Sequence, residues 1–359
     1  MALIWYEGFD ELPSGNAMSG PLLGLLSSLG VTALDLGAIS GTANIVAPGR
    51  FGANCMQMIS GNSSSPQIAM LMPSNMASGF VGFALNRSSW NGAQTVTLQD
   101  ITGNAAQCSI QFGANGVISA YDGGGNLLGQ SAALAYAAST WNYVEIGATI
   151  APGASGGALA VRVNTVPKLT LTNVATQKTA NAWFNQLIFT EAPSSYTTDL
   201  IDDMYLCDAT GAAPYNSYLG NARVQFLKPG APGASTQFTP SNTAEANWQN
   251  AGNANVDDTL YVYAATADDE DDYTVAPMAS QPTIWAARVK VAARQDDATQ
   301  RFIEPCLISA GTEVRDAAVA LTQTYTWVAG AIHTVDPHTG SAWTYTAINA
   351  AQVGVNLST

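Results

Sequence analysis

Carboxylates are the residues in this sequence whose type could support hydrolytic chemistry. Glycoside hydrolysis uses two carboxyl groups, one as the acid and the other as the nucleophile or base. A spacing such as Glu-x-Asp-x-x-Glu would supply them, and no such run occurs. Glu145 is alone in its predicted strand, and the adjacent Asp202 and Asp203 are expected to point to opposite faces of theirs. The sequence therefore predicts no catalytic residue and no enzymatic activity.

An acidic run offers oxygen atoms to a metal ion. Its aspartates are Asp268, Asp269, Asp271 and Asp272. Calcium takes about six to eight oxygen ligands, but this run lacks the glycine and the alternating spacing of a calcium loop. We therefore favour a solvated loop whose carboxylates repel one another, and a cation site in this loop stays as the alternative.

Other metal and cofactor motifs have little support. His333 and His338 are the only two histidines, so they lack the third and fourth ligands that zinc usually has. No G-x-x-x-x-G-K-[ST] run is present, so nucleotide hydrolysis has no support either. We expect no bound metal and no cofactor.

Aromatic side chains could stack on sugar rings. Among eight tryptophans and thirteen tyrosines, Trp90 is the best single candidate, because it lies in the polar run NRSSWNG. Protein interfaces are also enriched in aromatic residues, so a core or inter-subunit contact of Trp90 is the favoured interpretation. A glycan contact at Trp90 stays open.

The elements that would position these residues are β-strands. Residues 141–150 place apolar side chains on one face and Tyr143 and Glu145 on the other, and residues 283–294 alternate in the same way. No apolar stripe of helical period extends beyond about ten residues, and glycine-rich turns separate the short strands. The sequence therefore predicts an all-β protein of two jelly-roll-like β-sandwich domains, with few or no long helices.

The two domains are predicted to meet within residues 197–229. Alternation with period two predicts strands at residues 199–208 and 219–227, and the intervening DATGAAPYNS is rich in residues that break regular structure. We interpret the first strand as the last of one domain and the second as the first of the next. The predicted domains are residues 1–212 and a smaller one of residues 213–359.

Charge and cysteine usage restrict the partners. The net charge of −14, without a basic stripe, argues against nucleic acid and anionic membrane surfaces. Only 11% of the residues are charged, so the surface must consist of amide, hydroxyl and small side chains. Such a surface suits a protein covered by neighbours or one exposed for long periods outside a cell. The four cysteines are far apart, so we expect free thiols, consistent with a reducing cytosol.

We expect neither a membrane-spanning segment nor an export signal in this sequence. The N-terminus has no basic region followed by a long apolar core, so we expect no signal peptide. The apolar stretch at residues 21–31 is too short and too rich in glycine to span a bilayer. We therefore expect a soluble protein without membrane insertion.

Several runs of the front half form an ordered series. They are WYEGFD (residues 5–10), APGRFGANCMQM (47–58), GFVGFALN (79–86), QFGANGVISAYDGGGNLLGQS (111–131), WNYVEIGATI (141–150) and LIDDMYLCDATG (200–211). Together they resemble the concanavalin A-like lectin and glucanase sandwich that occurs in many structural proteins of tailed bacteriophages.

A second series lies in the back half. It consists of YLGNARVQFLKPGAPG (218–233), NWQN (247–250), VDDTLYV (256–262), RVKVAARQDDATQRFIEPCLISAG (288–311) and DPHTGSAWTYTAINAAQVGV (336–355). It is similar to a β-module that often follows such a sandwich in phage genomes.

The resemblance implies a structural component of a tailed-phage virion, located in the virion and assembled in the host cytoplasm. We expect a tail-associated fibre or appendage that forms a homotrimer or another cyclic oligomer and contacts virion proteins of the tail or capsid. Three alternatives stay open: a capsid decoration or head-fibre protein, a receptor-recognition module that binds a host surface glycan, and a carbohydrate-active enzyme. The resemblance names no catalytic residue.

Overall fold

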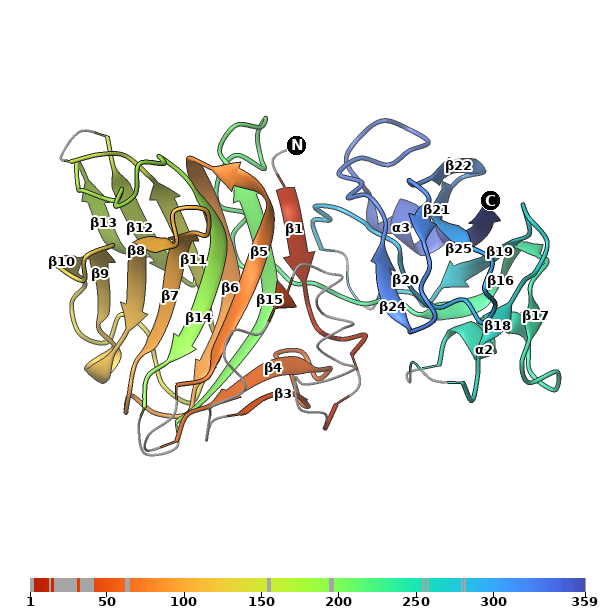
Figure 1. Ribbon diagram of the computed structural model, residues 1–359, viewed down its shortest axis with the longest axis horizontal. Helices are drawn as coiled ribbons and strands as arrows, with labels where there is room; N and C mark the ends of the chain where they lie inside the picture. The colour runs from red at the N-terminus through yellow and green to blue at the C-terminus, as the bar shows by residue number, and fades with distance from the viewer. Residues whose placement is uncertain are drawn as a thin grey trace. The chain divides into compact units, whose positions relative to one another are not determined.

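The computed structural model describes residues 3–12, 14–15, 31–32, 42–61, 65–153, 156–193, 197–253, 256, 258–278, 280 and 282–358. The chain divides into two compact units, the first ending at Gln225 and the second continuing from Phe226. Strands dominate both units (Figure 1), and the described α-helices are the short α2 (Asn247–Ala251) and α3 (Tyr345–Ala350). The prediction of an all-β protein with few or no long helices is therefore confirmed. Among the described residues, no helix is long and apolar enough to cross a membrane.

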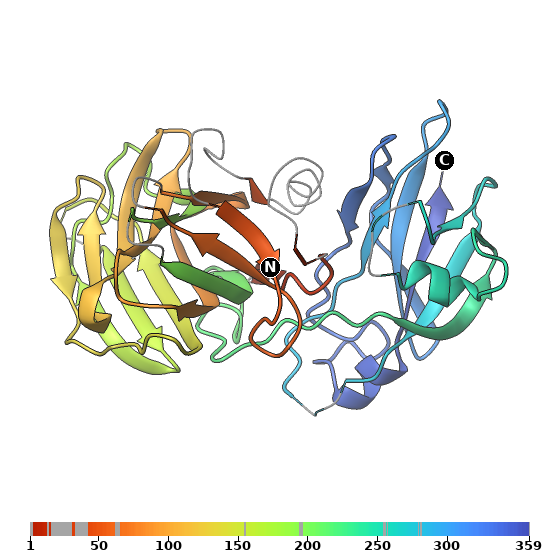
Figure 2. The ribbon, with the colours of Figure 1, turned by 90° about the horizontal axis from the view of Figure 1, so that it is seen from below.

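The first unit contains two antiparallel sheets (Figures 1 and 2). The eight-stranded sheet has the order β13 (Val166–Thr172), β12 (Ala158–Val163), β11 (Asn142–Thr149), β6 (Ser78–Arg87), β15 (Thr198–Asp208), β4 (Cys55–Ile59) and β3 (Thr42–Val46), and β1 (Leu3–Glu7) also pairs with β15. The seven-stranded sheet has the order β10 (Leu127–Gln130), β9 (Ile118–Asp122), β8 (Ala105–Phe112), β7 (Gln94–Asp100), β14 (Phe184–Glu191), β5 (Gln67–Met76) and β2 (Val31–Thr32).

The core of the first unit lies between these two sheets. Alternate residues along each strand point inward, as in β7, where Val96 and Leu98 are completely buried. Phe83 of the eight-stranded sheet meets Phe189 of the other sheet edge to face, with ring centroids 5.2 Å apart. This packing of apolar faces makes the first unit a β-sandwich.

The second unit is built on a six-stranded antiparallel sheet. Its order is β16 (Pro229–Thr236), β19 (Glu270–Val275), β25 (Gln352–Ser358), β21 (Phe302–Ser309) and β22 (Thr312–Arg315), and β23 (Val319–Ala320) also pairs with β21. Two-stranded sheets join β17 (Thr239–Pro240) to β18 (Val262–Tyr263) and β20 (Lys290–Ala293) to β24 (Thr326–Ala329). Val328 of β24 packs with Ile303 and Val355 of the large sheet in one apolar cluster.

Three predicted elements differ from the structure. Residues 219–227 form no strand, and regular pairing resumes only with β16. Most of residues 283–294 lies outside strands, apart from β20 and one bridge at Ala287. The acidic run is not wholly a loop, because β19 begins at Glu270 and pairs with β16 and β25. A period-two pattern indicates which side chains share a face of an extended segment. Formation of a strand also needs a neighbouring backbone with which the segment can pair.

Candidate functional site

The outward face of the eight-stranded sheet gathers polar side chains near its centre. Tyr143 and Glu145 of β11 and Tyr205 of β15 lie on this face, opposite the core-facing residues of the same strands. Gly82 of β6 stands between Glu145 and Tyr205 in the register, and a Cβ there would lie 2.0 Å from the Tyr205 ring. The missing side chain lets the Tyr205 hydroxyl reach across β6 and donate to Glu145 Oε1 at 2.5 Å.

The segment of residues 218–224, which we call the strap, covers this face. Its backbone donates to the sheet: Leu219 N to the Tyr205 hydroxyl at 3.0 Å, and Gly220 N to Glu145 Oε1 at 2.8 Å. The Tyr218 ring packs edge to face on Phe80 and lies 4.0 Å below the Arg162 guanidinium carbon. These contacts explain why the strap alternates like a strand in sequence yet pairs with side chains.

Arg50 anchors the far end of the strap. Its Nη1 atom lies 2.9 Å from Asp203 Oδ2 and donates to the carbonyl oxygen of Ala222 at 2.9 Å. Asp203 Oδ1 accepts from Val224 N at 2.8 Å, so the same carboxylate holds both Arg50 and the strap. The side chains of Arg50 and Asp203 are only 10% and 2% exposed, so this ion pair is largely removed from solvent.

A β-bulge overturns the prediction that Asp202 and Asp203 face opposite sides. Asp203 has a φ of 51°, and the pairing of β15 with β6 shifts between Asp202 and Tyr205. Both carboxylates therefore bond Arg50, since Asp202 Oδ2 accepts from Arg50 N at 2.8 Å. Burial, followed by the nearby charge of Asp203, raises the pKa of Asp202 to about 8. Burial also raises the pKa of Asp203, while the hydrogen bond from Val224 N and the Arg50 guanidinium act in the opposite direction.

The strap limits the chemistry of this face, because it bonds two of its carboxylates. The acceptor atoms Glu145 Oε1 and Asp203 Oδ1 are engaged by backbone N–H groups of the chain itself. Burial, together with the adjacent Glu145, raises the pKa of Tyr205 well above its ordinary value, so its hydroxyl remains a donor. The arrangement fixes a peptide on a sheet, and it holds these carboxylates under the strap.

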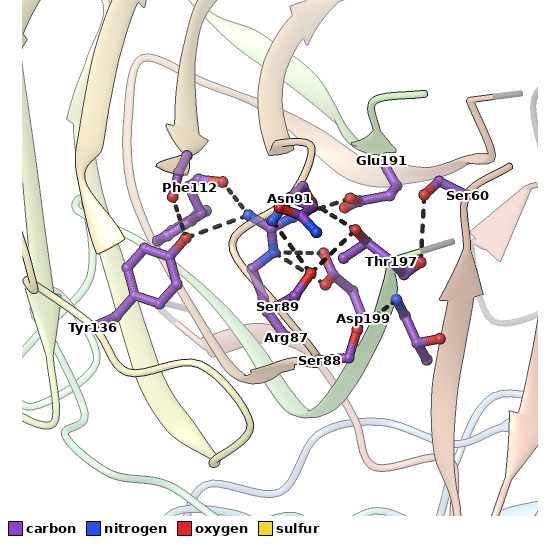
Figure 3. Close-up of polar contacts among 12 residues, drawn as sticks. Ser60, Arg87, Ser88, Ser89, Asn91, Phe112, Tyr136, Glu191, Thr197 and Asp199 are labelled. Atoms are coloured by element: carbon purple, nitrogen blue, oxygen red, sulfur yellow. Dashed lines mark hydrogen bonds and ion pairs between the residues drawn. The ribbon is translucent and has the colours of Figure 1, made fainter. Parts of the chain in front are cut away.

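A second polar cluster lies inside the first unit (Figure 3). The Arg87 Nε atom donates to both carboxylate oxygens of Asp199 at 3.0 and 3.1 Å, and Nη2 donates to Glu191 Oε1 at 3.0 Å. Nη1 donates to the Tyr136 hydroxyl at 3.3 Å and also to the carbonyl oxygen of Phe112. Burial and the neighbouring Asp199 raise the pKa of Glu191 far above its ordinary value, so one net negative charge faces Arg87. This cluster joins strands of both sheets and is structural.

Trp90 lies in the loop that follows Arg87. The loop is fixed by Thr197, whose hydroxyl donates to the carbonyl oxygen of Asn91 at 2.6 Å (Figure 3). The Trp90 side chain is half-buried, and its Nε1 atom has no hydrogen-bond partner among the residues that the structure describes. The glycan or interface contact of Trp90 stays a prediction.

The four aspartates of the predicted cation loop lie in different surroundings. Asp268 and Asp269 precede β19, whereas Asp271 and Asp272 occupy it and point to opposite faces. Asp271 is used structurally, because its Oδ2 atom accepts from the Tyr273 hydroxyl at 2.7 Å and from Asn247 Nδ2 at 2.6 Å. The four aspartates therefore do not occupy a single loop, and cation binding by them stays a prediction.

The two histidines contact different residues. His333 Nε2 lies 3.1 Å from Asp316 Oδ1, and His338 Nδ1 lies 3.0 Å from Thr312 Oγ1. Each histidine thus has its own neighbour. The four cysteines are buried free thiols.

The outward face of the seven-stranded sheet has a different character. In the register of β14, β7, β8 and β9, its partly exposed side chains lie in adjacent rows. These side chains, which we call the amide–hydroxyl face, are Thr95, Thr97, Gln99, Ser109, Gln111, Tyr121 and Thr190. None of them is charged, although the chain carries a net charge of −14. The flanking Leu127 of β10 pairs with Tyr121 and is 54% exposed.

Comparisons with known proteins give fold likenesses only. No family model matches the chain, and no curated protein matches it in sequence. Among solved structures, it is similar to the alginate lyase Aly36B at 10% identity, with a TM-score of 0.39, over 56% of this chain and 95% of that one. It is also similar to a carbohydrate esterase from the Shiga toxin-encoding bacteriophage phi24B (14% identity, TM-score 0.36, 57% and 98% covered). A third likeness is to the carbohydrate-binding module CBM66 from Bacillus subtilis (11%, 0.33, 50% and 96%). Those activities belong to the matched proteins.

Sequence reasoning missed the residues that organise the covered face. Arg50 and Tyr205 lie within the runs APGRFGANCMQM and LIDDMYLCDATG, but nothing in either run marks them as site residues. Their partners lie far away in the chain, as the separation of Arg50 from Asp203 shows. The glycine at position 82, within GFVGFALN, is the one sequence signal for the open space that Tyr205 fills.

Proposed function

We propose that this protein is a non-enzymatic structural component of a tailed-phage virion, a tail-associated fibre or appendage that acts by self-association and by contacts with other virion proteins. The observation that carries the proposal is the amide–hydroxyl face, a broad sheet surface without charge on an acidic chain. Its occupant is a second copy of the same chain within a cyclic oligomer.

Electrostatics favours this face for self-association. Copies of a chain with net charge −14 repel one another, and they can approach most closely where neither surface carries charge. Burial of Thr and Gln side chains avoids the desolvation penalty of buried ions, and their hydroxyl and amide groups can bond across the interface. The exposed Leu127 adds apolar area at the edge of the face.

The strap supports a role without catalysis. It holds Glu145 and Asp203, the carboxylates of the opposite sheet, in bonds to backbone N–H groups. A hydrolase would need such groups free to reach a substrate. Release of sugar from a host polysaccharide by the purified chain would contradict this part of the proposal.

Mass photometry of the full chain tests the proposal directly. We expect a discrete oligomer for the wild type and a monomer for Thr97→Lys, because a lysine at the centre of the face would have to be desolvated. The control is Thr170→Lys on β13 of the other sheet, where the side chain is exposed, and it should leave the oligomer intact. A wild-type monomer at micromolar concentration, or an oligomer unaffected by Thr97→Lys, would rule the interface out.

The position in the virion needs a separate measurement. Density for the chain on the tail in a reconstruction of the intact particle would support the tail assignment, whereas density on the capsid would support the decoration alternative. Binding on a glycan array that Trp90→Ala abolishes would favour the receptor-recognition alternative.

A further inference from the structure

The outward face of the six-stranded sheet in the second unit holds buried polar groups that the chain leaves without partners. Glu270 and Asp272 lie two residues apart on β19 and therefore share one face. Asn356 of β25 is paired with Glu270 in the register, so its side chain lies on the same face. The exposed fractions of Glu270, Asp272 and Asn356 are only 7%, 1% and 1%.

The neighbouring strand explains the burial of this face. Between Pro232 and Thr236 the register of β16 with β19 shifts, and the intervening residues pass over Asp272. A Cβ on Gly233 would lie 2.6 Å from the Asp272 Cβ atom, and Ser235 N donates to Asp272 Oδ2 at 3.1 Å. The bulge therefore covers Asp272 while bonding only one of its oxygens.

The remaining polar atoms have no hydrogen-bond partner among the described residues. They are Asp272 Oδ1 and both terminal atoms of the Asn356 amide. A buried polar group without a partner is strongly unfavourable, and an amide with both atoms unpaired is rare in folded proteins. Asn356 is therefore an observation independent of the acidic residues, and it points to a missing ligand.

Gly354 supplies space beside these atoms. It pairs with Asp272 on one side and with Cys306 on the other, and a Cβ at this position would lie 2.2 Å from Asp272 Oδ1. Oxygen atoms of Glu270 and Glu313 and the Cys306 sulfur all lie within 4.8 Å of one another. The Cys306 thiol is already used, because it donates to the carbonyl oxygen of Glu304 at 3.3 Å, and hard divalent cations prefer oxygen ligands to sulfur.

Charge on this face is incompletely balanced. Arg315 is the only basic residue that β16, β19, β25, β21 and β22 contain. Its guanidinium pairs with Glu270 Oε2 and with Glu313 Oε1, which leaves Asp272 without a basic partner. The Arg315 side chain is 42% exposed, so it lies toward the solvent side of the cluster.

We propose that Glu270, Asp272 and Asn356 bind a hard divalent cation, Ca²⁺ or Mg²⁺, on this face. Two carboxylates and an amide oxygen are the donors that such ions prefer, and water completes their coordination. The ion bonds Asp272 Oδ1 and Asn356 Oδ1 and neutralises the carboxylate that Arg315 does not reach. This site differs from the predicted loop, because it excludes Asp268, Asp269 and Asp271 and requires Glu270 and Asn356.

Calorimetric titration of the full chain with CaCl2 and, separately, with MgCl2 tests the site. We expect one ion per chain and a higher melting temperature of the second unit with the ion than with EDTA. Asp272→Asn and Asn356→Ala should each weaken binding tenfold or more. Asp297→Asn, an exposed carboxylate of the same unit paired with Arg301, is the matched control and should bind as the wild type does.

A second readout does not depend on the bound ion. In EDTA, Asp272→Asn should melt at a higher temperature than the wild type, because it removes one of several crowded acidic groups on this face. Failure of the wild type to bind either ion would overturn the site, as would unchanged affinity in Asp272→Asn. Binding lost in Asn356→Ala, in a variant whose circular dichroism spectrum matches the wild type, would support it even if Asp272→Asn did not fold.

Discussion

Both units bury carboxylates on the outward face of a sheet, but they satisfy them differently. In the first unit, Arg50 and the strap bond Asp203, and the strap also bonds Glu145. In the second unit, the β16 bulge covers Asp272 and leaves Oδ1 unbonded beside an unpaired Asn356. Burial of a polar face therefore does not ensure that each of its polar atoms has a hydrogen-bond partner. The chain itself bonds the first face except at Glu145 Oε2, which has no hydrogen-bond partner among the described residues, and we propose that a cation completes the second.

Removal of Arg50 should give the largest effect on this comparison. Arg50→Ala leaves the Asp203 carboxylate buried without its guanidinium, and loss of one partner of a buried pair costs about 3 kcal/mol or more. We expect a lower melting temperature of the first unit and faster hydrogen exchange in residues 218–224, measured by mass spectrometry.

The matched control for Arg50→Ala is Arg162→Ala. Arg162 also contacts the strap, but only through the ring of Tyr218, an interaction worth about 0.5–1 kcal/mol at exposed sites. Equal effects of the two substitutions would show that the buried ion pair is not what holds the strap.

Substitution of alanine for Gly82 or Gly354 should have different effects on the two faces. Gly82→Ala places a carbon 2.0 Å from the Tyr205 ring, which must move, and overpacking of this kind costs about 1–3 kcal/mol. Gly354→Ala displaces the Asp272 carboxylate, so its main expected effect is weaker cation binding. Thermal unfolding in EDTA and in CaCl2 distinguishes the two results. Ion-dependent loss of stability in Gly82→Ala would contradict the comparison.

The smallest expected effect is that of Tyr205→Phe. The substitution removes the hydroxyl that donates to Glu145 and accepts from Leu219 N, and a typical hydrogen bond contributes about 1 kcal/mol. We expect a modest loss of stability and faster exchange at the amide of Leu219. Phe80→Leu, which changes only the ring contact with Tyr218, is the comparison variant and should leave the exchange of Leu219 less affected. Unchanged exchange in Tyr205→Phe would show that the Tyr205 hydroxyl does not fix the strap.

Strand β11 shows how far the sequence can be interpreted. Alternation in residues 141–150 predicts the strand, and the structure has β11 at Asn142–Thr149 with Val144 and Ile146 in the core. The same pattern places Tyr143 and Glu145 on the other face, yet their exposed fractions are 1% and 0%. Period-two patterning shows that two side chains share a face, but it contains no information about a distant segment that later covers that face.

The candidate sites were harder to predict than the strands. The predicted cation residues include Asp272 but omit Glu270 and Asn356, because Asn356 is far from the acidic run in sequence and meets it only through the pairing of β19 with β25. The adjacent Asp202 and Asp203 were expected to diverge, and the bulge at Asp203 brings both to Arg50. Prediction from neighbouring residues fails at both places, because pairing with distant strands sets the register.

The order of residues alone predicts the all-β class, the placement of apolar residues on one face of each strand and the scarcity of charge. These follow from local side-chain chemistry, which the order of residues contains directly. Contacts made on folding place the strap on the eight-stranded sheet and bring Asn356 to Glu270. The same contacts put Gly82 and Gly354 where they leave space for Tyr205 and Asp272. Those outcomes depend on contacts between distant segments, whose free energies are set by burial and pairing that no local pattern specifies.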